Sequence, residues 1–555
     1  MSHPTSSPPS AFTKSVGPTS SEVGTLTRLD RLQDEPCRLD LWADWCVRRV
    51  LPSGTGLLCL AMFASWVPHY LTWPWWPDLD TNAAMALAWS QGVLPYRDVA
   101  AFAFPGQILL FRGLIAVFGP GKSWPIYALD AAMVCGLGLV LVLWSRRHFH
   151  RSWPGLVSFT ALLGYLANLN FSLVAQRDWQ AMWFIALALL SPTTWPGRWG
   201  RTASAFATAA AFAFRPHVIV FVPALLWAVA ESSRGERLSS AVRWVLLVGC
   251  GVVLAFLPLI IQGNFDDFLR GIRLASYGSR YNRATPTGMI GGVIRQVTEL
   301  RWLAVPLVVG LLSRSSSPTI QRESRIWLLA AIGVLAYKPL HPFPHDYLDH
   351  PRWVVWSVML GLLAANVLCQ RRLSGQLRLA LSVIVVAAAV PAKPAFCDPR
   401  AALAAIVDRE DDQVSAPPGY VHHMTAYQEK LYPWVDYRNA IDHLRNEFGA
   451  STKVANLLSY QLSAVGVAGR LPVFRNESGL LWKSQVGWDD CVFLDQLETT
   501  VDSVVIWSPN VEGPEPDLIS PAMIEAVHRW YEPDRSFGKI EVWKRKGDIG
   551  TNRSK

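Results

Sequence analysis

The chain has 555 residues, of which 51% are hydrophobic and only 17% are charged, with 26 tryptophans and a formal net charge of +9. An ordinary soluble domain carries about 25% charged residues. The composition therefore excludes a typical soluble enzyme and indicates a chain embedded in a membrane. For such a chain we expect membrane lipid, and no nucleic acid, as a partner.

The first part of the chain, residues 1–50, is expected to be a disordered cytoplasmic tail. Residues 1–36 are rich in Ser, Pro and Thr and have no apolar core, so we expect no cleavable signal peptide. Segments of this composition bury too little apolar surface to fold. Arg48 and Arg49 precede the first apolar segment and predict a cytoplasmic N-terminus.

Residues 51–395 contain apolar segments long enough to cross a bilayer, which takes about 20 residues of helix. Arginines cluster in the short links between them, such as Arg146, Arg147 and Arg151. Short Arg-rich links stay in the cytoplasm, so an even number of spans must separate neighbouring links. About eleven helices meet this condition: one that ends at Leu71, and others near 125–145, 154–171, 179–195, 203–214, 217–230, 242–262, 302–313, 326–339, 353–369 and 379–395.

Two segments of this region are not expected to be simple spans. Phe104–Gly119 is short and has Arg112 at its centre, where a charge costs about 2.5–3.5 kcal/mol on insertion scales. We therefore expect an amphipathic helix in the external interface. The pair 203–214 and 217–230 is broken at Arg215-Pro216 and is expected to form a partly re-entrant hairpin, because proline ends a helix.

The last part of the chain, residues 396–555, has polar residues throughout and no apolar run of spanning length. Three strand-like runs and two stretches of helical periodicity occur here: Val454–Leu458, Val504–Trp507 and Ile540–Trp543, and Tyr437–Phe448 and Met523–Tyr531. We expect an external α/β domain with its own core, ending in a helix, a turn and a final strand. A disulfide between Cys397 and Cys491 stays open.

The first external loop, residues 73–124, carries an unusual series of motifs. Pro77-Asp78-Leu79-Asp80-Thr81-Asn82 directly follows the first apolar segment; Gln91-Gly92-Val93-Leu94-Pro95-Tyr96-Arg97-Asp98 and Phe104-Pro105-Gly106 come next. The series resembles the first external loop of the GT-C glycosyltransferases, nearest to the protein-mannosyltransferase and lipid-A aminoarabinose-transferase branch. This resemblance covers roughly residues 50–350. It implies an inverting sugar transfer from a polyprenyl-phosphate donor, with an aspartate as the base.

Asp78 and Asp80 are the candidate catalytic residues. Transfer to a hydroxyl needs a base that meets water at the membrane surface. In an extended segment residues two apart share a face, so both carboxylates are expected to point into one cavity. The alternative is that they cap a helix starting near Thr81, a role that Asp80 fits well. In the family pattern an acid lies about seventeen positions before the Pro-Tyr, as Asp78 does before Pro95; Leu79 stands where a second acid is frequent.

Polar residues near the external ends of other helices are candidate ligands of the donor. Guanidinium groups bind phosphate bidentately, and an arginine among apolar spans, such as Arg215, needs an anionic partner or ligand. Two alternatives stay open: a local ion pair of Arg97 with Asp98, and a structural pair of Arg215 with a neighbouring acid. The candidates are Arg97, Asp98, Arg177, Asp178, Arg215, His217, Arg280, Arg283, Lys338, His341 and His345.

The histidines between Lys338 and His350 do not have a recognised metal-ligand spacing. We therefore assign no metal and no cofactor, although a divalent ion stays open. The segment is expected to line the mouth of the cavity, as the corresponding loop does in the family it resembles. Arg280 and Arg283 are interleaved with tyrosines and are expected to meet either an anionic headgroup or the carrier phosphate.

The sequence thus predicts a mostly α fold, a polytopic transmembrane helical bundle of the GT-C type with a C-terminal extramembrane α/β domain. The predicted function is a membrane glycosyltransferase of the bacterial inner membrane that moves a sugar from a polyprenyl-phosphate donor to an unidentified acceptor on the external face. A transporter or flippase of lipid-linked saccharides would favour internal repeats and acids within helices. A non-catalytic scaffold would tolerate loss of both carboxylates.

Overall fold

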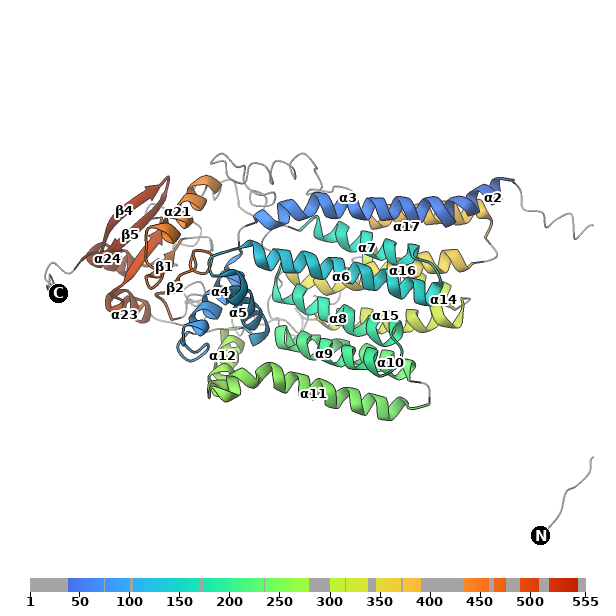
Figure 1. The fold of residues 1–555 in the computed structure, drawn as a ribbon, viewed down its shortest axis with the longest axis horizontal. Helices are drawn as coiled ribbons and strands as arrows, with labels where there is room; N and C mark the ends of the chain where they lie inside the picture. Colours follow the sequence, from blue (N-terminus) through green and yellow to red (C-terminus); the bar gives the residue numbers. More distant parts are fainter. Residues whose placement is uncertain are drawn as a thin grey trace, which may run out of the picture.

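The computed structural model describes residues 38–73, 75–99, 103–169, 173–233, 235–278, 300–314, 316–337, 346–370, 373–390, 433–458, 464–475, 490–508 and 519–547. A long helical bundle occupies one side of the molecule and a small sheet domain the other, with short helices between them (Figure 1).

The bundle contains a helix at each of the eleven segments expected from hydropathy and arginine placement. These helices run alongside one another in alternating directions (Figure 1). They are α3 (Leu51–Thr72), α6 (Trp124–Phe149), α7 (Trp153–Leu166), α8 (Arg177–Thr194), α9 (Arg198–Phe214), α10 (Val222–Ser232), α11 (Arg237–Ile261), α14 (Leu300–Ser313), α15 (Pro318–Tyr337), α16 (His350–Cys369) and α17 (Gly375–Ala389). A 3₁₀ turn, η2 (Pro216–Phe221), separates α9 from α10 at the predicted break.

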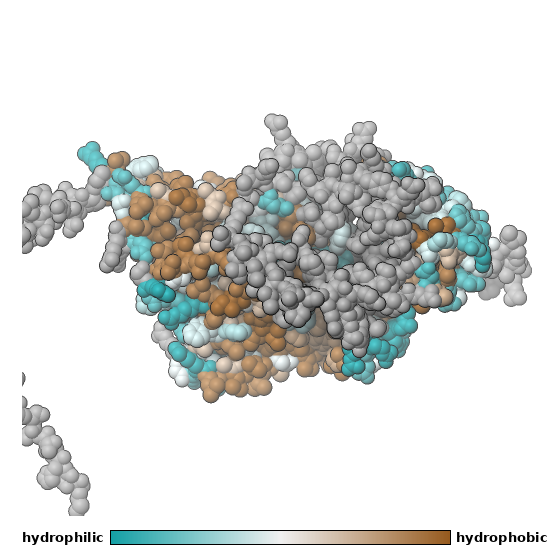
Figure 2. Space-filling view, turned by 180° about the vertical axis from the view of Figure 1, so that it is seen from behind, coloured by the Kyte–Doolittle hydropathy of each residue, from teal (hydrophilic) through white to brown (hydrophobic). Residues whose placement is uncertain are grey.

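On the face seen in Figure 2 the visible surface of the bundle is mainly hydrophobic, with hydrophilic residues toward its end, whereas the visible part of the sheet domain is largely hydrophilic. Leu57 on α3, Leu139 on α6 and Leu254 on α11 are each more than half exposed. Among the described residues, four helices are long and apolar enough to cross a membrane: Arg38–Leu71, Trp124–Phe149, Arg237–Ile261 and His350–Cys369. Such a surface is expected of an integral membrane protein, because exposed apolar side chains are unfavourable in water but not in contact with lipid.

The expected N-terminal tail is helical from Arg38, so disorder as far as residue 50 was a wrong prediction. Helix α2 (Arg38–Trp45) and the π turn η1 (Cys46–Val50) lead directly into α3. Asp44 pairs with Arg378 of α17 at 3.2 Å, and Asp40 accepts the Gln376 N–H at 3.3 Å. These polar contacts hold α2 against α17.

Three short helices lie between the bundle and the sheet domain: α4 (Pro77–Ser90), α5 (Pro105–Phe118) and α12 (Phe265–Gly278) (Figure 1). Helix α5 is the segment expected to lie in the external interface; it sits at the end of the bundle, and Arg112 packs over the Trp89 ring at 4.7 Å. Helix α4 begins at Pro77, four residues earlier than expected, because proline at a first helical position has its φ already set for the helix.

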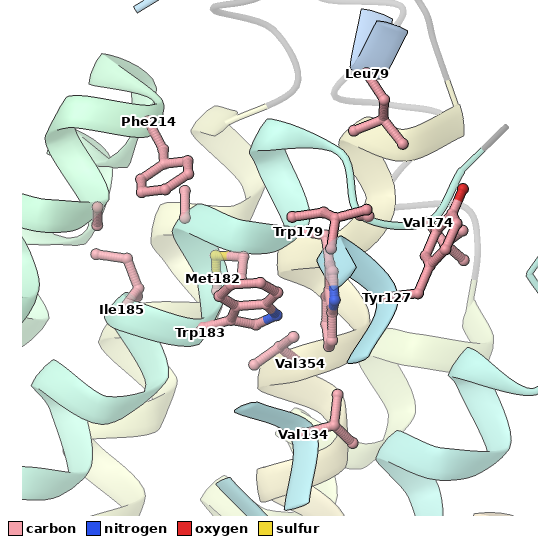
Figure 3. Packing of buried hydrophobic residues seen from close by; sticks show 14 of the residues in the cluster. Leu79, Tyr127, Val134, Val174, Trp179, Met182, Trp183, Ile185, Phe214 and Val354 are labelled. Atoms are coloured by element: carbon pink, nitrogen blue, oxygen red, sulfur yellow. The ribbon is translucent and has the colours of Figure 1, made fainter. Parts of the chain in front are cut away.

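Close packing within the bundle depends on small residues. A Cβ atom on Gly155 would lie 2.4 Å from the Leu141 carbonyl oxygen, and one on Gly361 would lie 2.6 Å from the Pro154 oxygen. Glycine thus lets α7 approach both α6 and α16, as small residues do in membrane helix pairs. Large aromatic side chains fill the centre: Trp179 and Trp183 of α8 lie among Val134, Val354 and Met182 (Figure 3).

The C-terminal domain is α/β, as its periodicity predicted. Its sheet has the order β2-β1-β3-β5-β4, in which β1 is parallel to β2 and β3, and β5 is antiparallel to β3 and β4. The strands are β1 (Lys453–Leu457), β2 (Leu471–Pro472), β3 (Ser503–Trp507), β4 (Tyr531–Phe537) and β5 (Ile540–Arg545), and the helices α21 (Trp434–Asn446), α23 (Cys491–Thr499) and α24 (Pro521–Trp530).

Strand β4 was not predicted, since its exposed polar residues and Pro533 indicated a turn. The strand lies at the sheet edge, where a proline removes no ladder hydrogen bond, and its register shifts between Pro533 and Arg535. Cys491 is a free thiol in the structure, and Cys397 lies outside the described residues, so the disulfide stays untested.

The membrane topology gives a first testable prediction. Links that carry arginines, such as Arg146–Arg151 between α6 and α7, lie at the end of the bundle away from the sheet domain (Figure 1). Because such links stay inside, alkaline phosphatase fused after Gln370 should be inactive, and the same enzyme fused after Lys555 should be active. If both fusions were inactive, the sheet domain would lie in the cytoplasm.

Candidate active site

Three successive side chains in the first turn of α4, those of Asp78, Leu79 and Asp80, point in three directions. Helical residues are rotated by about 100° each, so Asp78 and Asp80 point about 200° apart. Asp78 faces Arg177, Leu79 enters the hydrophobic cluster that contains Trp179 (Figure 3), and Asp80 faces the C-terminal domain. The expectation that both carboxylates share one cavity was wrong, because it assumed an extended backbone.

Asp78 and Arg177 face each other across the ends of α4 and α8. The Arg177 Nη2 atom lies 3.9 Å from Asp78 Oδ2, with 38% of the Asp78 side chain and 13% of the Arg177 side chain exposed. Among the described residues no group donates a hydrogen bond to the Asp78 carboxylate, and the buried Arg177 Nε atom has no acceptor. This loose pair leaves both groups able to bind a further ligand.

A buried amide chain fixes the distance between these two helices. Asn82 donates to the Asp78 carbonyl oxygen at 2.7 Å and to Gln107 Oε1 at 2.8 Å. Gln107 Nε2 in turn lies 3.0 Å from both the Ala175 carbonyl oxygen and Gln180 Oε1. All three amide side chains are at most 3% exposed. These three amides were not predicted to interact, although two glutamines and an asparagine within largely apolar helices were a visible signal.

Asp80 joins α4 to the C-terminal domain. Its carboxylate is 2% exposed and accepts the N–H of Val465 at 3.1 Å and that of Val467 at 2.6 Å. The helix-capping role expected for Asp80 was wrong, since α4 has already begun at Pro77. Burial raises the pKa of Asp80 to about 6, against the opposing effect of the backbone N–H groups of residues 464–467.

Asp178 and Arg215 form a buried ion pair at the ends of α8 and α9. The Arg215 Nη2 atom lies 2.8 Å from Asp178 Oδ2, and Arg215 Nε lies 2.9 Å from the same oxygen. Tyr337 donates to Asp178 Oδ1 at 2.6 Å. This is the structural pair that the sequence left open for Arg215; its contact with a carrier phosphate stays a prediction. His217 packs edge-on against the Tyr337 ring.

The Pro-Tyr-Arg-Asp turn is a compact local structure. Arg97 Nε donates to Asp98 Oδ1 at 2.9 Å, and this hydrogen bond lowers the pKa of Asp98. Tyr96 has a positive φ of 68°, donates to the Ala103 carbonyl oxygen at 2.7 Å and is buried, which raises its pKa against the field of Arg177. Asn264 ties the turn to α12 through the Pro95 oxygen at 2.9 Å.

Five of the predicted donor ligands lie outside the described residues: Arg280, Arg283, Lys338, His341 and His345. His350 begins α16 and accepts from the Tyr165 hydroxyl at 2.6 Å, while its Nε2 lies 2.8 Å from the Leu173 carbonyl oxygen. Within the part of the chain that the structure describes, no three acidic, histidine or cysteine side chains are placed to hold a metal.

Comparison with known proteins rests on the fold. No family model matches the sequence, and no curated protein matches it. The chain is similar to the crystal structure of ArnT from Cupriavidus metallidurans bound to undecaprenyl phosphate, with a TM-score of 0.50 and 13% sequence identity, over 89% of this chain and 99% of that chain. This likeness shows that the two proteins share a fold. The architecture expected from the first external loop is therefore supported over nearly the whole chain.

The ion pair of Arg215 predicts a loss of stability when it is broken. Arg215→Met should lower the free energy of unfolding by about 3–5 kcal/mol, because Asp178 would stay buried without its cation. Arg215→Met combined with Asp178→Asn should recover most of this loss. Denaturation of the purified proteins in detergent measures the free energy of unfolding of the single and the double variant. Arg198→Met, at an exposed position of α9, is the control; equal stability of the two single variants would show that the pair is not structural.

The raised pKa of Asp80 predicts a pH-dependent contact between the domains. A carboxyl whose pKa is raised from 3.8 to about 6 on docking binds more protons when docked. The contribution of Asp80 to the free energy of docking is therefore fully present below pH ~4. About 2–3 kcal/mol of it is lost as the pH rises through ~6. Hydrogen exchange of residues 464–470, corrected for intrinsic rates, should show protection falling over this interval. Asp80→Asn should abolish this pH dependence.

Proposed function

We propose that the protein is a membrane glycosyltransferase that transfers a sugar from a polyprenyl-phosphate donor to a hydroxyl acceptor on the external face of the membrane. One observation carries the proposal: Asp78 is a half-exposed carboxylate beside a cation at the end of an apolar bundle. The nearby acids are already bound, Asp80 by two backbone N–H groups and Asp178 by Arg215 and Tyr337. Of these three acids only Asp78 is half-exposed and without a hydrogen-bond donor among the described residues, so it is the one that can meet an acceptor hydroxyl.

In the proposed reaction Asp78 is the general base. It removes the proton of the acceptor hydroxyl as the acceptor oxygen attacks the anomeric carbon. The bond from that carbon to the phosphate oxygen breaks, and its electron pair leaves with the polyprenyl phosphate. A single displacement of this kind inverts the anomeric configuration.

Arg177 is the group we assign to the donor phosphate. Its side chain is nearly buried, its Nε has no acceptor among the described residues, and it lies beside the base. A guanidinium binds two phosphate oxygens at once and stabilises the charge that develops on the leaving group. Its place at the N-terminus of α8 adds the positive end of the helix dipole.

The structural neighbour supports the choice of donor. ArnT from Cupriavidus metallidurans was crystallised with undecaprenyl phosphate, a lipid of the class that we propose as the carrier. The hydrophobic surface of the bundle and the two polar groups at its end fit a donor with an isoprenoid chain and an anionic head. Experiment must identify the sugar and the acceptor. It must also test Arg97 and His217 as further ligands of the donor.

Replacement of the base gives the central test. Asp78→Asn keeps the size of the side chain but removes its charge, so turnover should fall by about 10²–10⁴ while folding is retained. Release of polyprenyl phosphate from polyprenyl-phosphate hexoses, with membrane extract as the acceptor source, measures turnover. Asp266→Asn, at an exposed position of α12, is the matched control. Full activity of Asp78→Asn would remove the main support for a transferase.

Replacement of Arg177 separates donor binding from proton transfer. Arg177→Met keeps most of the apolar side-chain volume and removes the phosphate contact, so donor KM should rise and turnover should fall together. Hydrogen bonds to charged groups typically contribute about 1.5–3 kcal/mol, which corresponds to a change of about 10- to 100-fold in donor kcat/KM. Unchanged donor kinetics would assign Arg177 to structure and move the phosphate site elsewhere.

A further inference from the structure

We propose that the C-terminal domain is a positioning element of the active site, and that its segment 464–470 holds the first turn of α4 so that Asp78 stays beside Arg177. Asp80 is the positioning residue through which the domain acts. This inference rests on the proposed function, in which Asp78 is the base. We assign no catalytic group to the domain itself, and its segment 464–470 contacts α4 at this turn.

The contact at Asp80 is specific and buried. Its two carboxylate oxygens each accept one backbone N–H, from Val465 and Val467, at 3.1 and 2.6 Å. Because the two donors come from one short segment, they constrain the direction of the carboxylate as well as its distance.

The backbones on either side also touch. A Cβ atom on Gly466 would lie 2.5 Å from the Asp80 carbonyl oxygen and 3.0 Å from the Ala84 nitrogen. A second close approach joins Gly469 to Gly121, in the link between α5 and α6, where a Cβ on Gly469 would lie 3.0 Å from the Gly121 nitrogen. The segment is therefore in contact with α4 and with the link before α6 at once, and both contacts are tight for any side chain.

The shape of the segment is set within its own domain. Arg445 of α21 donates twice to the Val467 carbonyl oxygen, at 3.1 and 2.7 Å. Arg470 is buried and donates to the carbonyl oxygens of Arg445 and Phe448 at 2.7 and 2.6 Å. A segment held by two arginines presents its N–H groups to Asp80 as a rigid unit.

The position of Asp78 depends on this contact because the two aspartates share one helical turn. From the bundle side, α4 is held by the Asn82–Gln107 hydrogen bond at 2.8 Å. From the other side it is held by segment 464–470. Loss of the second contact lets the first turn move, and a displacement of about 1 Å at a catalytic group costs as much as 10²-fold in rate.

The first variant disturbs the contact from the domain side, without a change in α4. Gly466→Ala places a methyl group against the backbone of Asp80 and Ala84. Gly547→Ala is the matched control, since a Cβ there meets no atom within 4 Å. Asp80→Asn is a second variant: its amide offers one acceptor instead of two and turns an NH₂ group toward a backbone N–H.

Two readouts on the full-length protein decide the outcome. Gly466→Ala and Asp80→Asn should lower turnover of polyprenyl-phosphate hexoses by about 10- to 100-fold, with donor KM changed by less than about threefold, since Arg177 is untouched. Hydrogen exchange of residues 80–84 should speed up about tenfold or more in both variants. Gly547→Ala should match the wild type in both readouts. Far-ultraviolet circular dichroism confirms that each variant is folded.

Different results separate this inference from the proposed function. Wild-type turnover and wild-type exchange in both variants would overturn the positioning role. Lost turnover with unchanged exchange would also overturn it, because the segment would then act on substrate directly and not through α4. An inactive wild type whose α4 exchange still rises in Gly466→Ala would refute the transferase and leave the mechanical coupling in place.

Discussion

The hydrogen bonds from Val465 and Val467 to Asp80 join the two halves of the molecule. A carboxylate that is 2% exposed must find donors, because an unpaired buried charge is costly. Among the described residues no side-chain cation supplies them; the backbone N–H groups of Val465 and Val467, 385 and 387 positions away, do. This requirement places Gly466 against α4, orients the sheet domain over the end of the bundle and holds the turn that carries Asp78.

The acidic residues at this end of the bundle show how local environment assigns different roles to the same side chain. Asp98 is paired with its neighbour Arg97 in an exposed turn, where such a pair contributes little stability. Asp178 is neutralised by Arg215 inside the bundle. Asp78 is left half-exposed at 3.9 Å from Arg177. Reactivity is expected at the acid that the fold leaves incompletely bound.

Buried polar groups also connect the helices at both ends of the bundle. Below the site, Asp130 of α6 accepts the Trp179 indole N–H at 2.7 Å and is bound by Tyr70 of α3. At the opposite end Glu323 of α15 accepts the Trp144 indole N–H at 2.9 Å. Such bonds have no water to compete with them inside an apolar bundle, so they specify which helices meet, while glycine contacts set how closely they pack.

The sequence by itself determined the class of protein, the helix positions and the α/β character of the last domain. The length of an apolar run, the arginines in a link and a strand-like run are local properties of the sequence. The places of residues such as Arg146 and Val504 could therefore be predicted without knowing which residues they contact. The resemblance of the first external loop to the GT-C enzymes also pointed to Asp78, through the position of an acid relative to Pro95. Only the tertiary structure decided the roles of Asp80, Asp178 and Gln107. Their partners lie 385, 37 and 73 positions away, and hydrogen bonds over such separations leave no periodic trace in the sequence.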